Sequence, residues 1–172
     1  MARRRHHEHT VRWVWAIGIA ALAGVAMSSR RASATPAPSP GASPINPSTG
    51  RPIVTRGGHT LTDAELRDLI ARHGFADAAK AFAIAKRESG GQADVIVDTR
   101  GMSAAQLLAY WGKPAAPELS AGLWQINVLA NGALVPGADV DTKASALTDP
   151  DTNAATALAL SHGGSSWGPW GA

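Results

Sequence analysis

Apolar residues recur at helical spacing in several windows of the chain. Leu66 and Leu69 follow Thr62 and Glu65, and Gly74 comes after them. Thr62 with an acidic residue three positions later is the pattern of a capping box, in which each side chain binds the backbone amide of the other. Glycine is the usual residue just beyond the end of a helix. The pattern therefore predicts a helix that begins at Thr62 and ends at Gly74.

Similar start and stop signals predict further helices over residues 76–89, 103–110, 122–129 and 148–161. Pro150 falls in the first turn of the last one, where its missing N–H costs nothing. Alternation with a period of two is weak, although the sequence DVIVD at residues 94–98 could form a short strand. We therefore predict a mostly α fold with a short β element near residues 94–98.

The N-terminal segment has the organisation of an export signal. Residues 1–12 are basic, and residues 13–27 are apolar and uncharged, which is the length of a signal-peptide core and short for a membrane span. Residues 32–34 (ASA) match a cleavage site, but the basic pair at residues 30–31 keeps a retained anchor open as the alternative. We interpret residues 1–34 as a signal peptide or membrane anchor. The domain is then exported to the cell envelope or the extracellular space and touches a membrane only through this segment.

Proline, serine and glycine dominate residues 35–58, which offer little apolar surface. This composition is typical of an extended, flexible linker. The remaining residues, 59–172, are enough for one compact domain and too few for two.

Composition excludes several classes of function. The chain has a formal net charge of +3, but its arginines cluster near the N-terminus, and acids and bases nearly balance after residue 51. We therefore do not expect nucleic-acid binding. The absence of cysteine rules out disulfides, thiolate zinc sites and cysteine nucleophiles. The histidines are scattered without a His-Glu-x-x-His spacing, so we expect no metal and no cofactor.

Glu88 is the sharpest chemical feature of the sequence. It stands at the end of the second predicted helix and shares a face with Ala81 and Ile84. Burial on that face would raise the pKa of its carboxyl and keep it protonated near neutrality. A protonated carboxyl at the edge of a cleft can donate to the leaving oxygen of a glycosidic bond. The ordinary alternative is a surface acid beside Lys86 and Arg87.

Four sequence blocks favour a catalytic role for Glu88 over an ordinary surface acid. AIAKRESGG (83–91), GLWQIN (122–127), DPDTNAATAL (149–158) and GGSSWGPW (163–170) together resemble the lysozyme-like superfamily. The match is nearest to soluble lytic transglycosylases and to related phage and actinobacterial muralytic domains. The resemblance covers about residues 60–172 and implies a single lysozyme-like domain. It implies an enzyme that cleaves the β-1,4 bond between N-acetylmuramic acid and N-acetylglucosamine in peptidoglycan glycan strands.

The resemblance also assigns roles to individual residues. Glu88 falls on the catalytic glutamate, and Ser89 on the serine that hydrogen-bonds near it. Residues 122–126 fall on the motif that lines the cleft floor, and Asn153 lies in the helix that buttresses the cleft. The family's tyrosine motif after that helix is absent here, and a neighbouring serine or histidine could take its place. The substrate-binding residues implied are Ser89, Gly122, Trp124, Gln125, Asn127, Ser161 and His162.

The mechanism depends on whether a second acid is present. A hydrolase needs one at about 5–9 Å from the first, whereas a lytic transglycosylase uses the sugar's own 6-hydroxyl. Asp94, Asp98 and Glu118 are the candidates, and each is otherwise an ordinary loop residue. The resemblance favours the lytic transglycosylase, with Glu88 as acid and then base. A hydrolytic muramidase and a catalytically inactive peptidoglycan-binding module remain as alternatives. An anchored factor that opens the wall locally for a secretion, conjugation or phage apparatus is compatible with the enzyme.

The aromatic residues allow two interpretations. Trp124 could line the cleft or its floor, where an indole would stack on a sugar ring, or it could fill the core. Trp167 and Trp170 are expected to pack and clamp the C-terminus. Tyr110 is expected at the surface, although it could reach the cleft.

Overall fold

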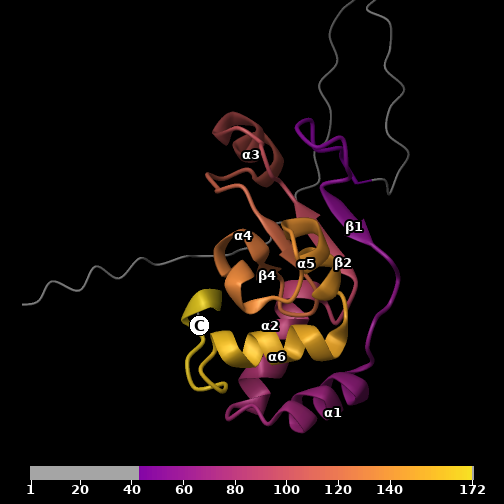
Figure 1. The fold of residues 1–172 in the computed structure, drawn as a ribbon, viewed down its shortest axis with the longest axis vertical. Coiled ribbons are helices and arrows are strands. Elements are labelled where there is room, and N and C mark those ends of the chain that lie inside the picture. The colour runs from indigo at the N-terminus through magenta and orange to yellow at the C-terminus, as the bar shows by residue number, and fades with distance from the viewer. Residues whose placement is uncertain (1–42, 172) are drawn as a thin grey trace, which may run out of the picture.

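Helices surround a small antiparallel sheet in the computed structural model, which describes residues 43–171 (Figure 1). The helices are α1 (Asp63–His73), α2 (Ala78–Ser89), α3 (Ala104–Trp111), α4 (Val128–Asn131), α5 (Val140–Ala146) and α6 (Pro150–Leu160). The strands are β1 (Val54–Arg56), β2 (Val95–Asp98), β3 (Leu119–Ala121) and β4 (Ile126–Asn127), and two 3₁₀ turns are η1 (Gly132–Leu134) and η2 (Gly168–Trp170). The predicted mostly α fold and the short strand near residues 94–98 are confirmed.

The helix ends follow the capping signals of the sequence. Thr62 and Glu65 form the capping box of α1, and Ser103 with Gln106 forms that of α3. Asp77 accepts a hydrogen bond from the backbone amide of Lys80 at the start of α2. These local contacts satisfy amides that have no partner within the helix, which explains why the starts of α1 and α3 could be predicted.

The sheet has the order β1-β2-β3-β4, and every neighbouring pair is antiparallel. The helices α1, α2 and α6 pack together, with α1 at one end of the molecule and α3 at the other (Figure 1). The main core lies between these helices and the sheet, and its largest buried side chains include Trp124, Leu66, Leu69 and Ile70. A separate small cluster of Ile53, Met102 and Leu107 lies under α3.

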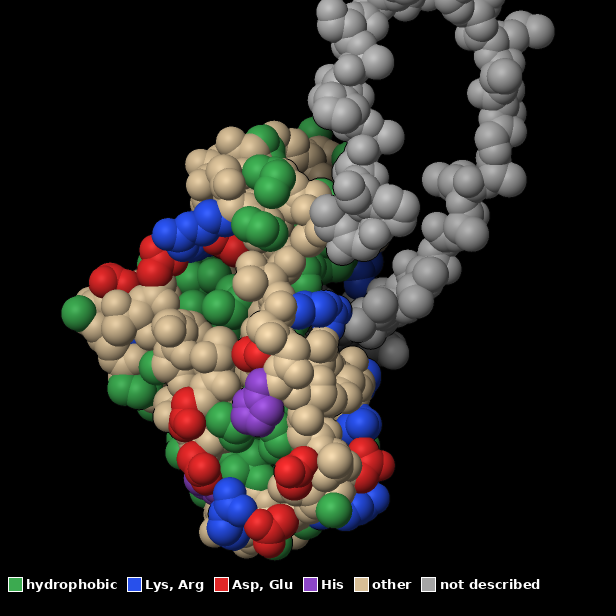
Figure 2. All heavy atoms as spheres, turned by 90° about the vertical axis from the view of Figure 1, so that its right-hand side faces the viewer, with side chains coloured by type: hydrophobic (Ala, Val, Ile, Leu, Met, Phe, Trp, Pro, Cys, Tyr) green, Lys and Arg blue, Asp and Glu red, His purple; other side chains and the backbone are tan. Residues whose placement is uncertain are grey.

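The surface carries charges of both signs. On the face shown in Figure 2, acidic and basic side chains are interspersed around the end of the molecule that α1 forms. Within residues 43–171, no helix is long and apolar enough to cross a membrane. The predicted signal or anchor, residues 1–34, lies outside the described residues.

The predicted linker differs from the structure in its described part, residues 43–58. Ile45 and Pro52 form a β-bridge, and β1 pairs with β2, so the ordered domain begins well before residue 59. Asn46 is fully buried and donates to the backbone carbonyls of Asp98 and Arg100 at 3.0 Å each. The composition of residues 43–58 gave no sign of this order, because it is poor in apolar residues. A few contacts with β2 stabilise the segment instead.

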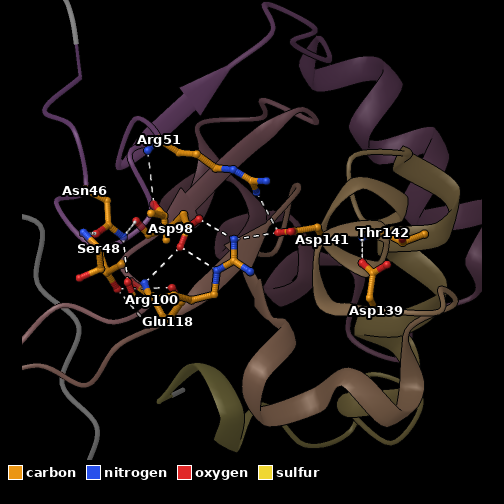
Figure 3. A network of polar contacts seen from close by, with 11 residues as sticks. Asn46, Ser48, Arg51, Asp98, Arg100, Glu118, Asp139, Asp141 and Thr142 are labelled. Carbon is orange, nitrogen blue, oxygen red and sulfur yellow. Dashed lines mark hydrogen bonds and ion pairs between the residues drawn. The ribbon is translucent and has the colours of Figure 1, made fainter.

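Arg100 ties the same region to α5. Its guanidinium donates to both carboxylate oxygens of Asp98, at 2.9 and 2.7 Å, and also pairs with Asp141 (Figure 3). Arg51 pairs with Asp141 as well, at 3.0 Å. Burial by itself would raise the pKa of Asp98, but the hydrogen bonds and charge of Arg100 outweigh it and lower the pKa. Asp98 therefore serves as the buried anchor of a structural ion-pair network.

The predicted helix over residues 122–129 is wrong. Residues 122–125 form the turn between β3 and β4, and only α4 is helical there. Gly122 and Gln125 have φ values of +78° and +46°, which lie outside the right-handed helical region. A Cβ on Gly122 would lie 2.1 Å from the side-chain nitrogen of Asn153, so only glycine allows this close approach. α5 was not predicted, although Asp139 caps it.

Substitution of Asn153 by alanine is expected to destabilise the domain by about 3–5 kcal/mol. The buried amide serves three backbone groups, namely the N–H of Trp124 and the carbonyls of Ala121 and Leu147. Each would lose its partner. Urea unfolding would measure the loss, and the matched control Asn131→Ala, which removes one partly buried hydrogen bond, is expected to cost less than about 1 kcal/mol. Equal costs for the two variants would contradict this role for Asn153.

Candidate active site

A large cleft runs across the sheet side of the molecule and holds Glu88. Its volume is about 1200 Å³, larger than the roughly 300–1,000 Å³ typical of small-molecule pockets. It is bordered by the end of α2, by β1 to β4, by the end of α3 with the residues that follow it, and by the C-terminal turn η2. A cleft of this size can hold a substrate larger than a typical small molecule.

Glu88 lies in the last turn of α2, where the helix meets the cleft. Its side chain is 16% exposed, whereas Ala81 and Ile84 on the same face are fully buried. Gly90 follows with a φ of +69°, so the backbone turns away directly after the acid. The carboxyl is therefore held by a packed helix while one side stays open to the cleft. This placement leaves the carboxyl accessible to a substrate in the cleft.

Arg87 is the side chain that contacts this carboxyl. Its Nε and Nη2 donate to Oε1 of Glu88 at 2.9 and 2.8 Å, and Nη2 also donates to the carbonyl of Trp170 at 2.8 Å. The C-terminal turn η2 is thus connected to the acid through one guanidinium. The sequence placed Arg87 next to Glu88 but gave no sign of this bridge, which depends on how η2 folds back.

Three of the other predicted site residues line the cleft with Glu88, namely Ser89, Gln125 and Asn127. Ser89 accepts from the amide of Gly91 and donates to the carbonyl of Ala85, so it shapes the end of α2. Gln125 donates to the carbonyls of Val95 and Gly122, and Asn127 caps α4. Each side chain holds the backbone that forms the cleft wall.

Trp124 is a core residue, which corrects the expectation that it contacts substrate. Its side chain is fully buried, its ring stacks on Phe75 with centroids 5.4 Å apart, and its Nε1 donates to the carbonyl of Ala81 on α2. Gly122 lies in the turn behind the cleft wall and is not among the residues that line the cleft. Trp167 and Trp170 are buried, as expected, and Trp170 also lines the cleft.

Ser161 and His162, which the resemblance suggested in the place of a tyrosine, lie outside the cleft lining. Ser161 is fully buried, and its hydroxyl donates to the carbonyl of Leu158 and accepts from the amide of Gly164. His162 is exposed, and neither residue lines the cleft. Arg87 is the residue that contacts the acid instead.

Of the three candidate second acids, Glu118 lines the cleft. It is 9% exposed and accepts a hydrogen bond of 2.8 Å from Ser120. Burial raises the pKa of its carboxyl, the bond from Ser120 opposes that shift, and the nearby charge of Glu88 adds to it. Glu118 and Glu88 therefore line the same cleft, and the charge of Glu88 acts on Glu118.

Asp94 and Asp98 lie outside the cleft. Asp98 is held by Arg100 in the network described above. Asp94 accepts from the amide of His59 at 2.8 Å, and a Cβ on Gly57 would collide with its carboxylate. Both aspartates therefore have structural surroundings, and neither is among the residues that line the cleft.

The sequence did not single out the wall of the cleft near α3. Tyr110, for which the sequence allowed either the surface or the cleft, lines the cleft together with Trp111, Lys113 and, from β1, Arg56. The sequence carried only a weak signal for this wall, because the end of α3 and the strand β1 are far apart in the chain and come together only in the folded domain.

The model of the family described as a lysozyme-like domain matches residues 68–172, more than half of the chain, so the chain belongs to this family. The match includes α2 with Glu88 and every other residue predicted for the site. Comparisons with curated proteins and with solved structures found no match. Membership places the chain among the glycosidases and transglycosylases that cleave peptidoglycan.

The raised pKa of Glu118 predicts how stability depends on pH. The folded state holds its proton more tightly than the unfolded state does. This group therefore favours folding below the unfolded pKa of about 4.3 and loses that effect as pH rises through the folded pKa. Glu118→Gln carries no such dependence, so its stability relative to wild type should increase between about pH 4 and about pH 7. Urea unfolding at both pH values is the measurement.

Glu65→Gln is the control with the opposite sign. The pKa of Glu65 is lowered by its hydrogen bonds from the amide and hydroxyl of Thr62. Its stabilising effect is present above the unfolded pKa and is lost as pH falls. This variant should lose stability relative to wild type over the same rise in pH. A constant difference for Glu118→Gln at the two pH values would contradict the buried, proton-holding carboxyl.

Proposed function

We propose that this domain is a lytic transglycosylase that cleaves the β-1,4 bond between N-acetylmuramic acid and N-acetylglucosamine, with Glu88 as acid and then base. One observation carries the proposal. The described part of the cleft offers one partly open carboxyl, Glu88, and the other cleft acid, Glu118, is buried and hydrogen-bonded. Such a site supplies the single acid that an intramolecular reaction needs.

The reaction balances without water. Glu88 gives its proton to the glycosidic oxygen while the bond from that oxygen to C1 of the muramic acid breaks. The 6-hydroxyl of the same sugar attacks C1 and forms the anhydro ring, and the carboxylate of Glu88 takes the hydroxyl proton. The guanidinium of Arg87, at 2.8 Å, lies where it can balance the negative charge that Glu88 carries between the two steps.

Export of the domain is part of this proposal. Peptidoglycan lies outside the cytoplasmic membrane, and the N-terminal pattern of a basic segment followed by an apolar segment is typical of export. The domain would then act in the cell envelope or outside the cell, either after cleavage of the segment or while anchored by it.

Glu88→Gln is expected to reduce the release of dye from labelled peptidoglycan by at least about a hundredfold. The amide has nearly the same shape but no proton to give, so binding to sedimented cell walls should persist. Glu65→Gln, an acid outside the cleft, is the control and should release dye like wild type. Wild-type activity in Glu88→Gln would contradict the proposal. Cell-wall binding by a wild-type protein that releases no dye would favour a binding module.

A hydrolytic muramidase is the second candidate, because Glu118 lines the same cleft and its pKa responds to the charge of Glu88. The two candidates differ in what they predict for Glu118→Gln. A hydrolase that uses Glu118 should lose about 10²–10⁴-fold in activity, whereas the transglycosylase should stay within about tenfold of wild type. Dye release by the purified variant distinguishes them, and a loss in the larger range would replace the proposal with the second candidate.

A further inference from the structure

The C-terminal turn η2 is held against the core by two buried tryptophans. The indole of Trp170 is buried, and its Nε1 donates to the carbonyl of Trp124 at 2.7 Å. Its ring packs against that of Trp167, with centroids 5.4 Å apart, and the Trp167 indole donates to the carbonyl of Gly164 at 3.0 Å. These contacts fix η2, and with it the backbone carbonyl of Trp170 beside the cleft.

Arg87 uses this carbonyl as a second point of attachment. Its side chain is 44% exposed, and an exposed ion pair with a neighbouring residue would by itself contribute little and leave the guanidinium mobile. However, Nη2 donates to the Trp170 carbonyl at 2.8 Å while Nε and Nη2 donate to Glu88. A planar guanidinium that is bound at both places has a defined orientation.

This contact distinguishes the two oxygens of the Glu88 carboxyl. Both hydrogen bonds from Arg87 fall on Oε1, at 2.9 and 2.8 Å, and Oε2 accepts none from residues 43–171. Oε2 is not buried, since the one buried side-chain oxygen without a partner in that range belongs to Asp94. Oε2 is therefore the open oxygen of an acid that lines the cleft.

An acid that first gives and then takes a proton must present an oxygen to two different atoms of the substrate. Misplacement by about 1 Å can cost on the order of a hundredfold in rate. Resting on the function proposed above, we propose that Arg87 is a positioning residue: held by η2, it fixes Oε1 so that Oε2 carries both proton transfers. Oε2 gives its proton to the glycosidic oxygen as the bond to C1 breaks, and takes the proton of the 6-hydroxyl as the anhydro ring closes.

Positioning differs from the balancing of charge, which any cation at this place could supply. Arg87→Lys keeps the charge, but an ammonium lacks the planar fork that holds Glu88 and the Trp170 carbonyl together. Arg87→Met removes the charge as well. Trp170→Phe leaves Arg87 in place and removes the indole N–H that ties η2 to Trp124. The three variants therefore separate orientation, charge and the contribution of η2.

Turnover of soluble, uncrosslinked glycan strands by the full-length protein is the first measurement. Arg87→Lys is expected to lower kcat about ten- to a hundredfold and to leave KM within about threefold of wild type, because orientation acts on the reaction and not on the binding of the strand. Arg87→Met should lose at least as much. The matched control is Arg72→Lys, which changes an arginine that pairs with Asp68 and Asp151 outside the cleft lining. It should turn over like wild type.

Hydrogen exchange of the arginine Nε–H groups, followed by NMR, is the second measurement and needs no substrate. The Nε–H of Arg87 donates to Glu88, whereas the guanidinium of Arg67 lies over the ring of Phe82, 3.9 Å from its centroid. In wild type the Arg87 group is expected to exchange at least about tenfold more slowly than that of Arg67. In Trp170→Phe this protection should fall. Thermal unfolding identifies a variant that has lost its fold.

Wild-type kcat in Arg87→Lys would overturn the proposal and leave charge as the only role of Arg87. Equal exchange of the two arginine groups in wild type would also overturn it, because an unprotected guanidinium cannot fix an oxygen. Unchanged protection in a folded Trp170→Phe variant would reject the contribution of η2. A wild-type protein that cleaves nothing but protects the Arg87 group would reject the proposed function and leave the positioning of Glu88 by Arg87 standing.

Discussion

The side chain of Asn153 forms hydrogen bonds through its nitrogen and its oxygen. Its partners are backbone atoms of the β3–β4 region and of the loop between α5 and α6. It donates to the carbonyls of Ala121 and Leu147 and accepts from the amide of Trp124, and no part of it reaches solvent. Gly122 must lack a side chain for this amide to fit. A buried amide with every partner in place holds one geometry, because any shift leaves a polar group unpaired in the core. The floor of the cleft depends on this contact.

Trp124 connects the turn between β3 and β4 to the helix that holds Glu88. Its indole donates to the carbonyl of Ala81, two helical turns before Glu88 on α2, and its own carbonyl accepts from Trp170. Trp170 in turn accepts from Arg87, which holds the carboxyl of Glu88. The turn, the catalytic helix and the C-terminal turn are thus linked by consecutive contacts. The tryptophan whose position suggested sugar stacking instead fixes the geometry from inside.

The features that were predicted correctly from the sequence are those that depend on contacts between neighbouring residues. The capping box at Thr62, the short strand β2 and the position of Glu88 at the end of α2 all depend on residues a few positions apart. The predicted helix over residues 122–129 was wrong because Asn153, far along the chain, imposes a turn there. The same reason applies to Glu118, whose burial beside Glu88 results from the pairing of β3 with β2 and has no local signature.

The central claim is that the single open acid, Glu88, cleaves the glycan without a water nucleophile. Digestion of purified peptidoglycan in water enriched in heavy oxygen, followed by mass spectrometry of the new chain ends, tests it most directly. The account predicts anhydro ends that carry no heavy oxygen, made by wild type and absent from a Glu88→Gln digest. Reducing ends that carry one heavy oxygen would contradict it, and would mean that water attacks the glycan.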